Sequence, residues 1–122
     1  MTTEKKLTHA DLYQFTGTEN WYKHGLVRNV LFTDGAKYVA DIAGAYWLLD
    51  EIALAQCYES AVADEEFQFW KLTVNPDQTG TLVCEDGNGH VVLTKPIPFT
   101  DFPLDEIKFY YTNNVILLPS EY

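Results

Sequence analysis

FQFWKLTV, at residues 67–74, is the segment from which the fold class follows. It is rich in aromatic and β-branched residues, which favour a strand, and the turn sequence NPD follows it directly. Side chains alternate between two faces along a strand, so Trp70 lies on one face while Phe67 and Phe69 lie on the other. The segment therefore predicts a strand that places aromatic side chains on both faces of a sheet.

More strands follow this segment, joined by short turns. DGNG at residues 86–89 favours a hairpin loop, and Asn113-Asn114 favours a tight turn. Pro96, Pro98 and Pro103 are expected to exclude regular pairing over the stretch that contains them. We expect strands at residues 81–85, 91–94, 107–112 and 115–118. These strands favour an antiparallel sheet, because parallel strands need longer crossover connections.

The longest helix is predicted before these strands, at residues 45–57. Leu48, Leu49 and Ile52 recur at spacings of three and four and form an apolar face. A second stripe has the same spacing and consists of Trp47, Glu51, Leu54 and Tyr58. A helix that is apolar nearly all round is buried between layers or presents one stripe to a partner.

Two shorter elements are predicted nearer the N-terminus. Residues 8–16 resemble a short helix, because Thr8 can cap it and an acidic residue follows three positions later. Residues 31–33 and 37–39 flank Asp34-Gly35, a pair that favours tight turns, and we expect them to form a β-hairpin.

Together these elements predict an α+β fold: an antiparallel sheet of about five to seven strands with one long and one short helix on one face. The chain has 122 residues, which fits a single domain over residues 1–122. Residues 1–6 form a short polar N-terminal tail.

The charge balance excludes several classes of function. The chain has 18 acidic and 8 basic residues and a formal net charge of -10, which argues against direct binding to nucleic acid. No apolar run approaches the roughly 20 residues of a membrane span, and the start lacks the apolar stretch of an export signal. We therefore expect a cytoplasmic protein whose two cysteines are reduced core residues.

No cofactor, metal or catalytic residue is predicted. Aligning residues 84–95 with a calcium loop would place Cys84 and Lys95 where oxygen ligands are required. His9, His24 and His90 have no zinc-ligand spacing. A small-molecule-binding or catalytic domain is the rival interpretation, and it would need a pocket lined by His24, Asp34 and Tyr38. Cys57 with His24 and Asp34 is the only nucleophilic set to consider.

The distribution of acidic residues is the most informative functional feature. Residues 41–66 contain no Lys or Arg, and most of the carboxylates lie in expected loops or at the ends of elements. Such a negative field attracts a basic groove and accelerates association with it, although acidity also serves solubility alone. The aromatic content is also high, at 15%, and suits a contact surface or a homodimer interface as well as a core.

Several segments carry a resemblance over nearly the whole chain. They are FTGTE (15–19), WY (21–22), TDG (33–35), GAYWLLDEI (44–52), FWKL (69–72), DGNG (86–89), FTDFPL (99–104) and LPSEY (118–122). The chain resembles a family of small uncharacterised bacterial proteins often carried on plasmids and prophages. The resemblance implies no catalytic or binding residue, but its setting favours a protein directed at the host.

We therefore expect a non-enzymatic acidic protein-binding domain whose partner has a basic groove. The specific hypothesis is an inhibitor of a host defence or nucleic-acid-binding complex, of the anti-CRISPR or anti-restriction type, in which carboxylates stand in for phosphates. Trp47 would be the apolar anchor. The charged contact residues would be Asp50, Glu51, Glu59, Asp64, Glu65 and Glu66.

Overall fold

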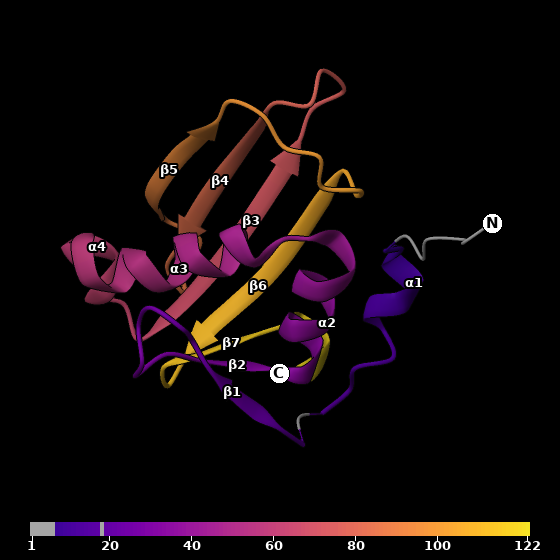
Figure 1. Cartoon of the computed structure of the whole chain (residues 1–122). Coiled ribbons are helices and arrows are strands. Elements are labelled where there is room, and N and C mark those ends of the chain that lie inside the picture. The colour runs from indigo at the N-terminus through magenta and orange to yellow at the C-terminus, as the bar shows by residue number, and fades with distance from the viewer. Residues whose placement is uncertain (1–6, 18) are drawn as a thin grey trace.

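A mixed sheet of seven strands organises the part of the chain that the computed structural model describes, residues 7–17 and 19–122. Its order is β1-β2-β7-β6-β3-β4-β5 (Figure 1). The strands are β1 (Trp21–Lys23), β2 (Leu31–Thr33), β3 (Phe67–Val74), β4 (Gly80–Glu85), β5 (Val91–Ile97), β6 (Glu106–Thr112) and β7 (Val115–Leu117). The predicted tail at residues 1–6 lies outside the described residues.

The α+β class is confirmed, with one departure from a purely antiparallel sheet. Every neighbouring pair of strands is antiparallel except β2 and β7, which are parallel. After β2 the chain forms three helices and then strands β3 to β6 before it returns as β7. That long connection is what allows the parallel pair.

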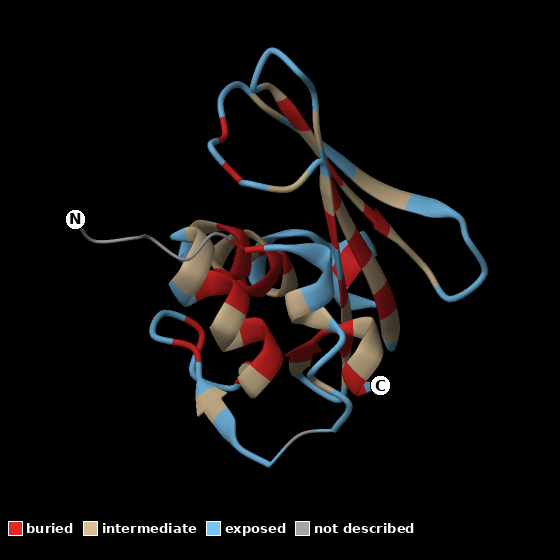
Figure 2. Cartoon of the chain, turned by 90° about the vertical axis from the view of Figure 1, so that its right-hand side faces the viewer, coloured by how far each residue is buried: buried red, intermediate tan, exposed pale blue. Residues whose placement is uncertain are grey.

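Helices α2 (Asp34–Ala43), α3 (Tyr46–Tyr58) and α4 (Ser60–Ala63) lie on one face of the sheet (Figure 1), and the view turned by 90° in Figure 2 shows the helical layer to one side of the strands. The predicted alternation along β3 is present: Gln68, Trp70 and Leu72 are buried, whereas Phe67 and Phe69 are partly exposed. The helices are α1 (His9–Leu12), α2 (Asp34–Ala43), α3 (Tyr46–Tyr58), α4 (Ser60–Ala63) and the 3-10 turn η1 (Pro119–Glu121). α2 and α4 are additions to the predicted pair, and α1 is shorter than predicted.

α3 confirms the long predicted helix to within one residue at each end. Leu48, Leu49 and Ile52 are at most 1% exposed and form the face that packs on the core. The second stripe is less buried, and Tyr58 at its end is 79% exposed. The helix therefore has one core-facing stripe and one stripe that reaches the surface.

The predicted hairpin at residues 31–39 is wrong in its second half, because residues 37–39 belong to helix α2. Thr33 caps this helix by accepting a hydrogen bond from the Ala36 backbone N–H at 3.2 Å. Val39 and Ala40 complete a buried apolar face, and Gly44, with φ 62°, ends the helix in the left-handed conformation. An N-cap with helical apolar spacing therefore outweighed the Asp-Gly turn signal.

The prediction that Pro96 excludes regular strand pairing is wrong, because Pro96 lies within β5 and pairs with Thr81. β5 is the last strand of the sheet, so the side of it that faces away from β4 needs no backbone donor. An edge strand tolerates proline for this reason. Strand β1 at the opposite edge was not predicted, since three residues carry little periodic signal.

The C-terminal turn fixes the start of α2. Glu121 is 8% exposed and accepts hydrogen bonds from the Thr33 hydroxyl at 2.6 Å, the Gly35 N–H at 3.1 Å and the Leu118 N–H at 2.9 Å. Its carboxylate thus supplies acceptors to a helix N-terminus, where negative charge is favourable. This contact holds the two halves of the chain together beside the β2–β7 pair.

Candidate functional site

Four predicted contact residues gather at one end of the molecule, which we call the acidic edge: Glu59, Asp64, Glu65 and Glu66. They lie on the segment that runs from the end of α3 through α4 to the start of β3, and α4 is at the outer end of the helical layer (Figure 1). Glu65 is half-buried and the other three are exposed. None of the four carboxylates has a hydrogen bond or ion pair with a described residue.

Strand β4 brings further carboxylates toward this edge, because Glu85 pairs with Phe69, the third residue of β3, and Asp86 follows it. Burial is the main cause that raises the pKa of Cys84 to about 12, and the negative charges of Glu65, Glu85 and Asp86 raise it further. Negative charge near a thiol raises its pKa because it disfavours the thiolate. The end of β4 consequently extends the acidic edge.

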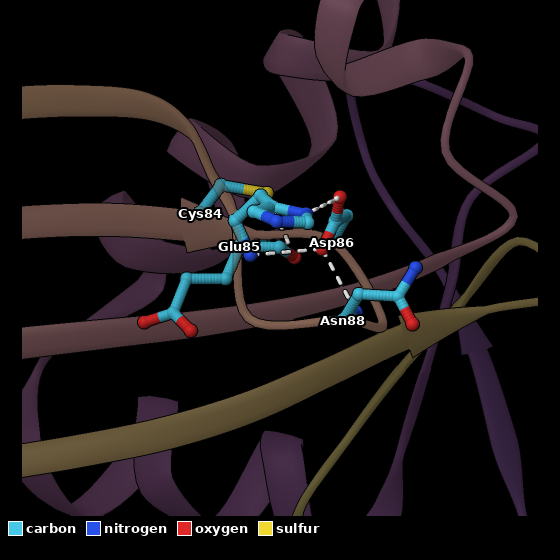
Figure 3. Close-up of polar contacts among 5 residues, drawn as sticks. Cys84, Glu85, Asp86 and Asn88 are labelled. Carbon is cyan, nitrogen blue, oxygen red and sulfur yellow. Dashed lines mark hydrogen bonds and ion pairs between the residues drawn. The ribbon is translucent and has the colours of Figure 1, made fainter.

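Within this extension, Asp86 has a local structural role. Its Oδ1 accepts hydrogen bonds from the backbone N–H groups of Asn88 at 2.8 Å and His90 at 2.9 Å, and these contacts lower its pKa (Figure 3). Figure 3 shows the Glu85 side chain pointing away from this loop. The structure thus has a hairpin loop at DGNG, and no described residues form a group of three His, Cys, Asp or Glu suited to a metal ion.

A buried amide fixes the backbone of the acidic edge. Gln68 is fully buried on β3, and its Nε2 donates to the carbonyl groups of Val62 at 2.8 Å and Glu65 at 3.2 Å. Its Oε1 accepts from Trp70 Nε1 at 2.9 Å and from Gln56 Nε2 at 2.8 Å. Because buried amides are costly unless paired, this network holds α4 and the following loop in one position.

Trp47, Asp50 and Glu51, the other predicted contact residues, belong to the first half of α3, although Glu51 lines a hollow together with Tyr58 and Glu59. Asp50 accepts a hydrogen bond from His24 Nε2 at 2.8 Å, and Glu51 pairs with Lys95 at 2.5 Å. Trp47 is partly buried against the core, about 18 Å along the helix axis from Glu59 at about 1.5 Å per residue. Tyr58, at the end of the same α3 stripe as Trp47, is an exposed aromatic residue directly before Glu59.

The structure does not bring all three residues of the rival pocket, His24, Asp34 and Tyr38, into one depression. Asp34 and Tyr38 line an open depression of about 790 Å³ together with Lys37 and Tyr22. His24 does not line it, and is only 4% exposed. The two ring nitrogens of His24 are both bonded: Nδ1 accepts from the N–H groups of Leu26 and Val27, so Nε2 carries the proton that Asp50 accepts.

The cysteines differ from the prediction of two core residues. Cys84 is buried but Cys57 is exposed, and both are free thiols. Since both nitrogens of His24 are bonded to other groups, the structure lends no support to a set of Cys57, His24 and Asp34. The Asp34 carboxylate instead accepts a hydrogen bond from the Tyr22 hydroxyl at 2.9 Å.

An aromatic cluster borders the acidic edge on the sheet face opposite the helices. Phe67 lies 5.0 Å from Tyr110 and 5.5 Å from Tyr122, measured between ring centroids. Tyr122 is 72% exposed. The alternation along β3 predicted the position of Phe67, but nothing in the sequence indicates that the last residue of the chain packs on it.

The fold and this end of the sheet define the class: an acidic α+β protein whose unpaired carboxylates gather beside exposed aromatic rings. The chain belongs to the Family of unknown function (DUF6876), which matches residues 6–122. No curated protein and no solved structure matches the chain. Among the described helices, none has the length and hydrophobicity needed to cross a bilayer.

Proposed function

We propose that this chain is a non-enzymatic protein-binding domain that inserts its acidic edge into a basic groove of a partner. The observation that carries the proposal is that Glu59, Asp64, Glu65 and Glu66 have no partner among the described residues, although they share one end of the fold. Unpaired like charges that are held close together repel one another and destabilise the fold, but their combined negative field attracts a basic surface. Carboxylates placed in this way can occupy sites that otherwise hold phosphates.

We choose the residues that contact the partner by two criteria: the side chain is exposed, and it has no ion pair or hydrogen bond within the fold. Tyr58, rather than Trp47, is the apolar anchor, because it is 79% exposed and directly precedes Glu59. Asp50 and Glu51 contribute only after their contacts with His24 and Lys95 are broken or shared. Tyrosine suits this role since its ring buries apolar area while its hydroxyl keeps a polar contact.

The proposal extends to a biological setting. We propose a mobile-element accessory protein that acts in the cytoplasm and inhibits a host defence or nucleic-acid-binding complex, as in anti-CRISPR or anti-restriction mimicry. Support comes from the resemblance to proteins of plasmids and prophages and from the net charge of -10. The genes that flank members of the family test this setting, because the proposal predicts mobile-element and anti-defence genes among them.

Partner capture with matched charge reversals tests the binding function. The test variant combines Asp64→Lys, Glu65→Lys and Glu66→Lys, and the control combines Glu19→Lys, Asp101→Lys and Asp105→Lys, which change the net charge equally at exposed positions elsewhere. We expect the native chain and the control to retain a basic partner that is released by high salt, while the test variant loses it. Equal binding by both variants would contradict the proposal.

Light scattering on the purified protein addresses the homodimer interpretation. A monomer at the concentration used for capture agrees with a free acidic edge. A stable dimer that the three edge reversals dissociate would replace the proposed function with self-association.

A further inference from the structure

A hollow of about 630 Å³ lies at the end of the sheet where β3 begins and β6 ends. Its lining includes Glu65 and Glu66, the aromatic residues Phe67 and Tyr122, and the Asn113-Asn114 turn. The hollow therefore joins unpaired carboxylates, aromatic rings and amide groups in one concave site. Of the described residues that line it, Glu65 and Glu66 contribute acidic side chains.

The walls of this hollow are held in place by contacts within the fold. Asn113 and Asn114 have φ of 52° and 64°, the left-handed conformation that asparagine tolerates in a tight turn. Asn114 accepts a hydrogen bond from the Tyr111 hydroxyl at 3.2 Å, and its carbonyl accepts from the Leu31 N–H at 2.8 Å. On the opposite side, the Gln68 amide fixes the backbone of Glu65. The site is thus largely formed before any ligand arrives.

We infer that this hollow is a socket for a guanidinium group, and that it receives an arginine side chain of the basic partner; this inference rests on the proposed function. Guanidinium is planar, stacks on aromatic faces and bonds carboxylates in a forked geometry. Tyr122 and Phe67 supply aromatic surface, Glu65 and Glu66 supply charge, and the asparagine side chains supply further acceptors. A lysine ammonium would gain the charge but lose the stacking and the forked contact.

Titration with two small cations tests this inference on the isolated protein. Ethylguanidinium and propylammonium carry the same charge but differ in shape, and NMR follows the signals of Phe67, Tyr122 and the Glu65 and Glu66 amides. We expect ethylguanidinium to bind at these residues about threefold or more tighter than propylammonium, as its stacking predicts. Equal binding of the two cations, or shifts centred on other residues, would overturn the socket.

Three variants separate the contributions. Glu65→Gln with Glu66→Gln should weaken ethylguanidinium binding about tenfold, whereas the matched control Glu19→Gln with Asp101→Asn, two exposed carboxylates outside the hollow, should change it less than about twofold. Tyr122→Ala should remove the preference for guanidinium while keeping weak attraction for both cations. An unchanged preference in Tyr122→Ala would exclude stacking, and unchanged unfolding midpoints verify that each variant is folded.

The outcome for the socket is distinguishable from that for the proposed function. If the edge reversals abolish partner capture but neither cation prefers the hollow, the binding function stands and the socket fails. If ethylguanidinium binds selectively and the edge reversals leave partner capture unchanged, the socket stands as a guanidinium site and the proposed role of the edge fails.

Discussion

Two groups of carboxylates in this molecule have opposite environments. Glu121 is buried, accepts hydrogen bonds from Thr33, Gly35 and Leu118, and fixes the N-terminus of α2. Glu65 and Glu66, at the end of the sheet where β3 begins, have no partner for their carboxylates among the described residues. The difference shows that the role of an acidic residue here depends on the donors around it: the first group stabilises the fold, and the second is available to another molecule.

Removing the buried carboxylate should have the largest effect on stability. Glu121→Ala leaves the Thr33 hydroxyl and the N–H groups of Gly35 and Leu118 without their acceptor, and we expect a loss of about 3 kcal/mol in the free energy of unfolding. Urea denaturation measures it. Glu59→Gln is the matched exposed control and should stay within about 0.5 kcal/mol. Equal losses in the two variants would erase the distinction between the two groups.

Crowding the same carboxylate should have the next largest effect. A Cβ at Gly35 would overlap the Glu121 carboxylate, with its Cδ at 2.7 Å, and would meet Leu118 Cδ1 at 2.8 Å. Alanine normally stabilises a helix relative to glycine, but here the overlap should prevail, and Gly35→Ala should cost about 2 kcal/mol. A thermal midpoint equal to or above that of the native chain would show that the C-terminal turn does not hold this helix start tightly.

Asp34 should show a smaller, pH-dependent effect of pairing. The Tyr22 hydroxyl is the main cause that lowers its pKa below the usual 3.8, so its contribution is present at neutral pH and is lost as the pH falls below about 4. The stability gap between the native chain and Asp34→Asn should therefore be wider at pH 7 than at pH 3. Denaturation at both pH values measures the gap, and Tyr22→Phe should narrow it. A gap independent of pH would contradict this assignment.

Neutralising the acidic edge should have the smallest effect on stability, and with the opposite sign. Glu65→Gln with Glu66→Gln removes like-charge repulsion and should raise the free energy of unfolding by about 0.3 kcal/mol at low ionic strength. The gain should disappear in 1 M salt, where the Debye length is about 3 Å. A clear loss of stability would mean that these carboxylates have partners within the fold.

The sequence predicted those parts of the structure that depend on local periodicity. β3 was predicted at its observed bounds because its alternation ends at a turn sequence, and α3 because its apolar face spans three turns. The start of α2 was misjudged because Asp34-Gly35 favours both a hairpin turn and, after Thr33, a helix start. The acceptor that completes this start is Glu121, 86 positions beyond Gly35, and no local pattern reveals it.

The candidate site was predictable to the same extent. Asp64, Glu65 and Glu66 are adjacent in sequence, so their shared location followed from the run itself. Asp50 and Glu51 belong to the same acidic stretch, but their partners lie 26 and 44 positions away, and only the fold shows that they are already paired.

Site-specific photo-cross-linking can show whether a partner binds at the acidic edge. A photoreactive residue replaces the exposed Ala61 on α4, and a second variant carries it at the exposed Asp101, beyond the opposite end of β3. We expect the Ala61 probe to cross-link to a basic protein in host cells. Asp64→Lys with Glu65→Lys and Glu66→Lys should abolish this product, and the Asp101 probe should give none. A product from Asp101 alone, or one from Ala61 that survives the three reversals, would contradict the claim that the acidic edge is the binding surface.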